Sequence, residues 1–163
     1  MKELILMRHA KSSWDVEQLT DHERPLNKRG IKDAKRAGEI LAELDFEPQL
    51  VLSSDSQRTQ ETWKLISKSC TRRPLVCFLP SLYLSSIGAI QEVVEFIHPQ
   101  TQRILLLGHN PGWSEAQGWL TGKYVEFKTS TIAIMSHESD NWQEAIQTPR
   151  SWKQIHIIHP NEL

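Results

Sequence analysis

Two arginines and two histidines in this chain stand where they could bind and attack a phosphoryl group. Arg8 and His9 directly follow one short apolar run, Arg58 follows a second, and His109 follows another. None of the four has an obvious carboxylate partner beside it in sequence. Four potential cations without matching anions predict an anionic ligand. Guanidinium forks suit phosphate oxygens because they donate paired, charge-assisted hydrogen bonds.

The residue types also allow a covalent mechanism. Histidine can act as a nucleophile, so a neutral imidazole at His9 could attack phosphorus in line with a leaving group. Arg8, Arg58 and a protonated His109 would then stabilise charge on the equatorial oxygens, which is the main task in phosphoryl transfer. Arg58 would lie in the first turn of a helix, whose free backbone N–H groups and dipole also favour an anion. A lone histidine in a loop is rarely catalytic, so the argument depends on the conjunction of all four.

Strands and helices alternate along the part of the chain that must position these side chains. Short apolar runs predict strands at residues 4–7, 49–53, 75–79 and 104–108. Between and after them, helices are predicted at residues 56–69, at 87–97 and after Pro111. A further helix should begin at the N-cap residue Asn27 and present one apolar face, made of Ile31, Ala34, Gly38, Leu41 and Leu44.

This alternation predicts an α/β fold, a three-layer α/β/α sandwich around a mostly parallel sheet. Residues 131–137 and 153–159 read as two more strands that pair antiparallel at an edge, which makes the sheet mixed. Ligands of open α/β sheets bind beyond the carboxyl ends of the strands, which is where Arg8 and His9 fall. We expect residues 1–163 to form a single domain.

The composition is that of an ordinary globular protein and excludes several classes. The chain has 163 residues, 39% apolar and 24% charged, with a formal net charge of −1. It therefore lacks the overall positive charge that is typical of nucleic-acid-binding proteins. No apolar run reaches the roughly 18 residues of a membrane span, and, because the first strand begins almost at Met1, we expect no signal peptide before it. Cys70 and Cys77 match no metal or redox spacing and are interpreted as free thiols. We therefore expect a cytoplasmic protein.

Several segments resemble the signatures of the histidine phosphatase superfamily, which has the phosphoglycerate-mutase-like fold. They are "LILMRHAKSSW", "VLSSDSQRTQET" and "LLLGHNPG", with further similarity in "DHERPLNKRGIKDA", "FLPSLYLSS" and "KTSTIAI". The short chain is most similar to SixA-type phosphohistidine phosphatases. The resemblance implies that His9 is phosphorylated and that Arg8, Arg58 and His109 form the phosphate pocket, with Arg24 as a further substrate-binding residue. It implies no metal and no cofactor.

The chain departs from many superfamily members in one informative place. They carry a glutamate after the third strand as proton donor, whereas this chain has Pro80-Ser81-Leu82-Tyr83. An alkoxide leaving group needs such an acid, but the imidazole of phosphohistidine is far less basic, with a pKa near roughly 6.5. The missing glutamate therefore predicts that phosphoramidates are better substrates than phosphate esters. Three acidic residues stay open as alternative proton donors: Asp21, Glu23 and Asp55.

The resulting hypothesis is a phosphohistidine phosphatase that takes a phosphorylated protein, such as a histidine-phosphotransfer domain, in signal transduction. Short connections between elements predict an open site. Two alternatives stay open: a phosphomonoesterase for a small metabolite, and a non-catalytic module that binds phosphoproteins. A basic stripe of Lys28, Lys32 and Lys35 or Arg36 is more typical of a solvated helix face than of a docking patch.

Several other sequence patterns give weaker indications of a binding site. "GWLTGK" has the wrong glycine spacing for a P-loop, and His156 and His159 lie three apart on a strand, too poorly aligned to chelate a metal. His22, His98 and His137 have no partner pattern and are interpreted as structural. Trp14 and Trp113 each follow a candidate motif closely, and both are possible walls of the pocket.

Overall fold

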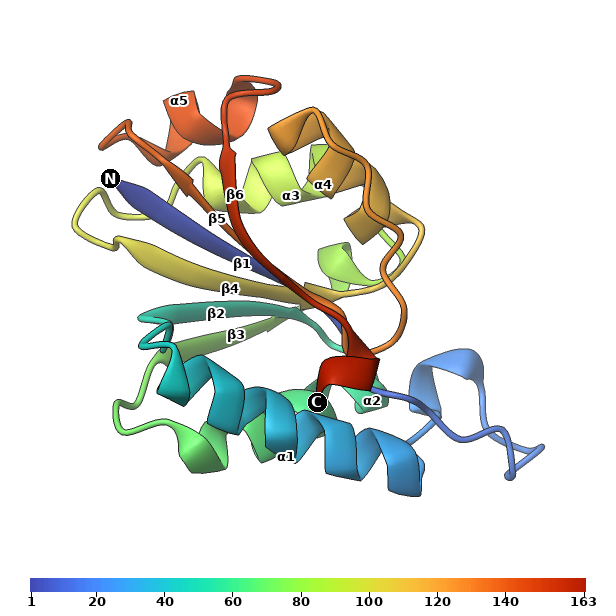
Figure 1. Ribbon diagram of the computed structural model, residues 1–163. Helices are drawn as coiled ribbons and strands as arrows, with labels where there is room; N and C mark the ends of the chain where they lie inside the picture. The colour runs from blue at the N-terminus through green and yellow to red at the C-terminus, as the bar shows by residue number, and fades with distance from the viewer.

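A computed structural model describes all residues from Met1 to Leu163 and contains one six-stranded mixed sheet (Figure 1). The strand order is β3-β2-β4-β1-β5-β6. The first four of these strands are mutually parallel, whereas β5 runs antiparallel to both β1 and β6. The strands are β1 (Lys2–Arg8), β2 (Leu50–Ser54), β3 (Leu75–Leu79), β4 (Arg103–Gly108), β5 (Ile132–His137) and β6 (Lys153–Ile158). The predicted α/β sandwich with a mostly parallel mixed sheet is confirmed.

Helices cover both faces of the sheet. In Figure 1, α1 and α2 lie on one side, and α3, α4 and α5 lie on the other. Their bounds are Lys28–Glu43, Gln57–Ile66, Ile87–Val94, Gly112–Thr121 and Trp142–Gln147, in chain order, and short 3-10 helices span Asp21–Glu23, Ser67–Ser69, Pro80–Leu82 and Pro160–Glu162. Helix α5 was not predicted from the sequence. None of the helices combines the length and apolar character that crossing a bilayer requires.

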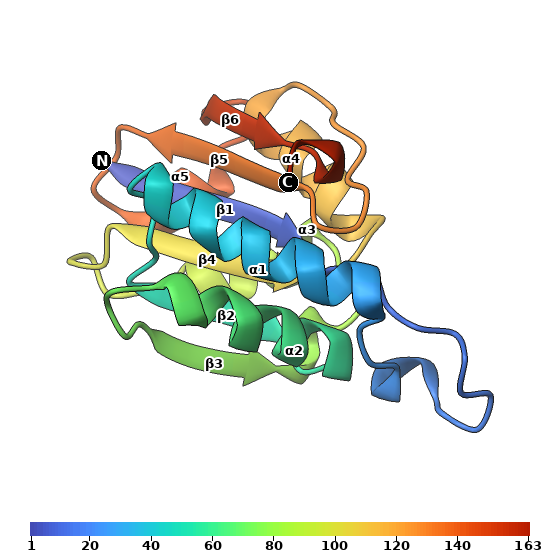
Figure 2. The same ribbon diagram turned by 60° about the horizontal axis from the view of Figure 1, so that its bottom comes forward.

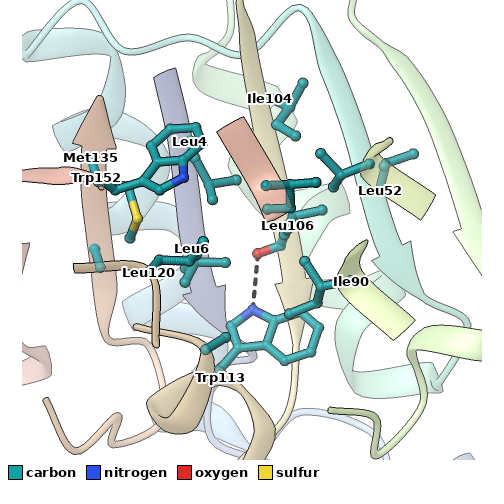
Figure 3. Close-up of a cluster of buried hydrophobic side chains, with 14 of the residues drawn as sticks. Leu4, Leu6, Leu52, Ile90, Ile104, Leu106, Trp113, Leu120, Met135 and Trp152 are labelled. Atoms are coloured by element: carbon teal, nitrogen blue, oxygen red, sulfur yellow. Dashed lines mark hydrogen bonds between the residues drawn. The ribbon is translucent and has the colours of Figure 1, made fainter. Parts of the chain in front are cut away.

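Side chains alternate between two hydrophobic clusters along the central strands. Leu4 and Leu6 of β1 pack into the cluster under α3, α4 and α5, whereas Ile5 and Met7 pack into the cluster under α1 and α2. Strand β4 follows the same alternation, which explains why both strands read as continuously apolar. Trp113 is fully buried in the first cluster, and its Nε1 donates a 3.2 Å hydrogen bond to the Leu106 carbonyl (Figure 3). The prediction that Trp113 walls the pocket is therefore wrong.

Helix α1 begins as predicted, and Ala34, Gly38 and Leu41 of its predicted face are buried. The Asn27 side chain accepts a 2.8 Å hydrogen bond from the Gly30 N–H, so the N-cap is confirmed. Ile31 and Leu44, predicted to be apolar contacts, are instead 40% and 38% exposed. The buried side of α1 also includes Gly30, and both glycines allow close approach, because Gly30 lies against the backbone of Lys11 and Gly38 against that of Ile66.

The parallel register brings three loops to one edge of the sheet. Arg8, the last residue of β1, pairs with Gly108, the last residue of β4. His9 and His109 therefore leave the sheet as neighbours, although 100 positions separate them in the sequence. Strand β2 lies on the other side of β4, so the loop that leads to Arg58 opens at the same edge. The fold thus positions three segments around one point.

We expect Gly30→Ala to destabilise the protein by about 1–3 kcal/mol, as overpacking of a tight contact does. A Cβ at position 30 would lie 2.1 Å from the carbonyl oxygen of Lys11, in the segment that leaves β1. Gly88→Ala in α3 is the matched control, because its Cβ would have no neighbour closer than 3.8 Å. Urea unfolding should show this control unchanged or stabilised by up to about 1 kcal/mol. Equal midpoints for both variants would refute the packing argument.

Candidate active site

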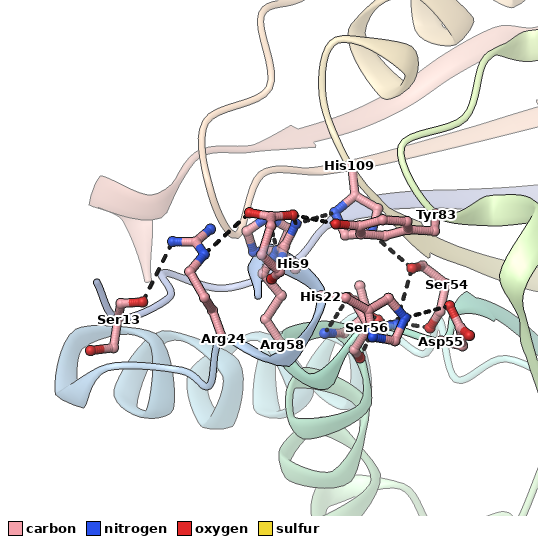
Figure 4. Close-up of polar contacts among 12 residues, drawn as sticks. His9, Ser13, His22, Arg24, Ser54, Asp55, Ser56, Arg58, Tyr83 and His109 are labelled. Atoms are coloured by element: carbon pink, nitrogen blue, oxygen red, sulfur yellow. Dashed lines mark hydrogen bonds and ion pairs between the residues drawn. The ribbon is translucent and has the colours of Figure 1, made fainter. Parts of the chain in front are cut away.

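All five residues predicted for the site line one cavity of about 150 Å³ at the carboxyl edge of the sheet. Arg8 and His9 come from the end of β1, Arg58 from the first turn of α2, and His109 from the end of β4; Arg24 comes from the loop before α1. The complete lining is Arg8, His9, Lys11, Ser12, Trp14, Arg24, Arg58, Leu84, His109, Asn110 and Thr129. Figure 4 shows His9, Arg58 and His109 close together.

Hydrogen bonds fix the tautomer of His9. Its Nδ1 lies 2.6 Å from the carbonyl oxygen of Ala10, which can only accept, so Nδ1 carries the proton. Its Nε2 lies 3.3 Å from Nε of Arg58, which can only donate, so Nε2 is the unprotonated nitrogen. The nucleophilic lone pair of a neutral imidazole is therefore at Nε2, the nitrogen beside the Arg58 guanidinium.

The tautomer of His109 is fixed in the opposite sense. Arg58 Nη2 lies 3.3 Å from His109 Nδ1, which must accept, so the proton resides on Nε2 and is donated to Ser54 Oγ at 2.8 Å. The two imidazole ring centres are 5.3 Å apart. One buried guanidinium thus contacts both rings and holds their acceptor nitrogens toward itself.

Both imidazoles are neutral in the ligand-free site. Burial is the main cause that lowers the pKa of His9 well below 6.5, and the charges of Arg58 and Arg8 add to it against the hydrogen bond to Ala10. Burial and then the Arg58 charge lower the pKa of His109 to about 3. The prediction of a protonated His109 therefore does not hold for the free site. A bound phosphate dianion would supply the missing counter-charge and raise both pKa values.

Arg8 offers donors that no protein group uses. Its Nη1 donates a 2.9 Å hydrogen bond to the Phe127 carbonyl, which anchors the side chain. Its buried Nε has no hydrogen-bond partner. A buried N–H without an acceptor is costly, so an oxyanion in the cavity would satisfy it.

Asp21 contacts the site arginines in a way that the sequence did not reveal. Its carboxylate accepts from Arg58 Nη2 at 3.0 Å and from Arg24 Nε at 3.2 Å, so the predicted absence of a matching anion is wrong. The Tyr83 hydroxyl also donates to it. Burial alone would raise the pKa of Asp21, but the hydrogen bonds from Tyr83 and Arg58 hold it below its ordinary value. The contact was invisible in sequence because Asp21 and Arg58 lie 37 positions apart.

Further contacts hold the loop between β1 and α1 over the cavity. His22 Nε2 lies 2.9 Å from the Asp55 carboxylate, so His22 has a partner that the sequence did not reveal. Trp14 is 71% exposed and lines the cavity, and the Arg24 guanidinium stacks 3.4 Å above its ring centre. The prediction that Trp14 could wall the pocket fits this position. Histidine, cysteine and carboxylate side chains nowhere form a cluster of three that could hold a metal ion.

Helix α2 is capped so that Arg58 is held rigidly. Ser56 is its N-cap and accepts from the Thr59 N–H, while Thr59 Oγ1 donates to the Ser54 carbonyl at 2.7 Å. One turn later, Thr62 Oγ1 accepts a 3.1 Å hydrogen bond from the N–H of Ala10, the residue after His9. The polar residues of "SSDSQRTQET" therefore link α2 to β1 as well as carrying Arg58.

Comparison with known proteins identifies the family. A model of the histidine phosphatase superfamily (branch 1) matches residues 4–77. An uncharacterized chloroplastic protein of Arabidopsis thaliana is 38% identical over 173 residues, which cover 98% of this chain and 78% of that protein. The chain belongs to the histidine phosphatase superfamily. This membership supports a phosphatase as the enzyme class.

Solved structures share the fold. The protein histidine phosphatase SixA in complex with tungstate superposes with a TM-score of 0.83 at 19% identity, covering 98% of this chain and 97% of SixA. A mycobacterial glucosyl-3-phosphoglycerate phosphatase in complex with VO3 gives a TM-score of 0.68 at 13% identity, covering 94% of this chain and 97% of that one. The predicted phosphoglycerate-mutase-like architecture is thereby confirmed.

We expect NMR to find both site imidazoles neutral at pH 6.5, His9 protonated on Nδ1 and His109 on Nε2. The pKa values of both are lowered, so each should gain its second proton only at a pH below that of an ordinary histidine. Long-range ¹H–¹⁵N correlation spectra report the tautomers, and exposed His98 serves as the internal control. Imidazolium signals from both residues in the ligand-free protein at pH 6.5 would contradict the assignment.

We expect Asp21→Asn to bind tungstate or vanadate about three- to tenfold more tightly, because a like charge beside the oxyanion is removed. The amide oxygen can still accept from Arg58, whereas the amide NH2 replaces the oxygen that accepts from Arg24, so Arg58 should keep its position while Arg24 loses this partner. Inhibition constants measure the effect, with Asp15→Asn on the same loop as the control. A loss of kcat above about 100-fold would instead identify Asp21 as a proton donor.

Proposed function

We propose that this protein is a phosphohistidine phosphatase that acts through a phosphohistidine-enzyme intermediate. The observation that carries the proposal is the unprotonated Nε2 of His9, which shares a cavity with the guanidinium groups of Arg8, Arg24 and Arg58. This arrangement supplies a nucleophile together with donors for the phosphoryl oxygens. The likeness in fold to SixA, which is described as a protein histidine phosphatase, supports the same choice of substrate class.

The reaction then proceeds in two displacements. In the first, His9 Nε2 forms a bond to phosphorus while the bond from phosphorus to the substrate imidazole nitrogen breaks, and that nitrogen keeps the electron pair. Arg8 and Arg58 stabilise the charge on the transferred PO3 group. In the second, water attacks the phosphorylated His9, releases inorganic phosphate and restores the neutral imidazole. The hydrogen bond from Nδ1 to Ala10 keeps the ring aimed through both steps.

None of the candidate side chains near the cavity is free and protonated so that it could act as general acid for an alcohol leaving group. Tyr83, the last residue of the segment that replaces the usual glutamate, donates its hydroxyl proton to Asp21. The pKa values of Asp21 and Glu23 are both lowered: burial favours protonation of Asp21 but its hydrogen bonds prevail, and Glu23 accepts from the Thr20 N–H and hydroxyl. Asp55 is paired with His22. A leaving imidazole can take its proton from solvent, so phosphoramidates are the favoured substrates.

A phosphomonoesterase for a small metabolite is the second candidate. The shared fold with glucosyl-3-phosphoglycerate phosphatase supports it, because the same framework carries ester hydrolysis in that protein. The absent acid argues against it for this chain. The third candidate, a module that only binds phosphoproteins, predicts binding without turnover that His9→Ala leaves unchanged.

We expect kcat/KM for a histidine-phosphorylated protein and for phosphoramidate to exceed that for sugar phosphates by at least about 100-fold, since proton donation to an ester typically contributes that much. Steady-state assays across this panel measure the preference, and His9→Ala should abolish all turnover. His98→Ala, which changes an exposed histidine far from the cavity, is the control. Comparable kcat/KM on an ester and a phosphoramidate would favour the phosphomonoesterase.

A further inference from the structure

A basic surface with an apolar centre lies beside the active site, on helices α1 and α2. We call it the α1–α2 face. Two hollows of about 470 and 280 Å³ meet there, and Ile31 and Lys35 line both. Ile31 is 40% exposed at its centre, next to Leu26 and Leu65. Around this centre stand five exposed lysines: Lys28, Lys32, Lys35, Lys64 and Lys68.

The acidic residues of the α1–α2 face are already engaged by other groups. Asp33 pairs with Arg29 at 3.1 Å, and the Glu39 and Glu43 carboxylates both pair with Arg36. Glu61 accepts from the Leu26 N–H at 2.7 Å and from the Gln57 side chain. None of the five lysines forms a salt bridge. The face therefore carries local positive charge that the net charge of −1 conceals.

The α1–α2 face is continuous with the active-site cavity. Leu26 forms an isolated β-bridge with Ser12, and Ser12 lines the cavity. Leu26 also lies two residues after Arg24, and Arg58 is in the first turn of α2. Figure 2 shows α1 and α2 side by side, both beginning at the edge of the sheet where the segment after β1 leaves. A macromolecule seated on the face would therefore reach the phosphate pocket.

We propose that the α1–α2 face docks an acidic surface on the protein that carries the phosphohistidine. This inference rests on the proposed function for the identity of the substrate. The unpaired lysines complement carboxylates, and Ile31 offers an apolar contact that a partner side chain would cover. Charge of this kind steers association and should make it sensitive to salt. Protein substrates would thus be selected by a surface outside the catalytic pocket.

The double reversal Lys32→Glu and Lys35→Glu tests the proposal. We expect kcat/KM for a histidine-phosphorylated acidic histidine-phosphotransfer domain to fall about tenfold or more, chiefly through KM, while kcat/KM for phosphoramidate stays within about twofold. Increasing NaCl should lower the wild-type value for the domain and affect the variant less. The control variant is Lys123→Glu with Lys153→Glu, two exposed lysines outside the α1–α2 face, which should leave both values unchanged.

Other outcomes separate failure of docking from failure of the proposed function. A variant that retains wild-type kcat/KM on the domain overturns the docking surface, as does an equal loss on phosphoramidate. If the wild type hydrolyses neither substrate, the proposed function fails. Binding of the fluorescently labelled unphosphorylated domain then tests the docking surface by itself. Weaker binding by the reversal variant supports docking, and equal binding overturns it. A reversal that abolishes binding to phosphatidylserine vesicles but not to the domain also overturns the protein partner.

Discussion

The buried guanidinium of Arg58 is the interaction on which the site depends. It is 2% exposed and donates to His9 Nε2, to His109 Nδ1 and to the carboxylate and carbonyl of Asp21. Because arginine cannot accept a hydrogen bond, each ring nitrogen that faces it must be unprotonated. One side chain therefore sets the tautomers of two histidines, and its charge adds to the burial that suppresses their protonation. In the proposed mechanism, this leaves Nε2 of His9 available as the nucleophile.

The charge balance of the pocket follows from the same constraint. Arg8, Arg24 and Arg58 line the cavity, and the two imidazoles stay neutral. One carboxylate, that of Asp21, pairs with Arg24 and Arg58 from outside the cavity lining. A phosphoryl group entering this space meets donors already oriented, including the unpartnered Nε of Arg8. Preorganised donors of this kind stabilise transferred charge without reorganisation, which is the main contribution a protein makes to phosphoryl transfer. Under the proposed function, the lack of a protonated side chain beside the cavity favours leaving groups that need no general acid.

The sequence predicted those parts of the molecule that depend on local pattern and strand-end geometry. Parallel strands must bring their carboxyl ends together, so the strand pattern alone places Arg8, His9 and His109 at one edge, and the Asn27 cap follows from local hydrogen bonding. Their catalytic roles stay predictions. Features set by long-range contacts were missed. Periodicity predicted that Ile31 would be buried with Ala34, Gly38 and Leu41, but Ile31 is 40% exposed, and the close contact of Gly30 with the backbone of Lys11 was not visible in the pattern.

The contact between Asp21 and Arg58 and the existence of helix α5 were missed for related reasons. Asp21 reaches Arg58 only because its loop folds back over the cavity, and α5 has six residues, too few for helical periodicity to emerge. The protonation state of His109 required knowledge of burial, since the same residue in water would titrate near its ordinary pKa. The sequence therefore predicted which side chains meet at one cavity, whereas their protonation states and their partners from distant loops depend on packing.

A crystal structure with orthovanadate bound would test the central claim most directly. The account predicts vanadium bonded to Nε2 of His9, with its oxygens accepting from Arg8 and Arg58 and with the Nδ1 proton of His9 still donated to the Ala10 carbonyl. Vanadate bound outside this cavity, or bound within it while the His9 ring presents Nδ1 or turns away, would contradict the account.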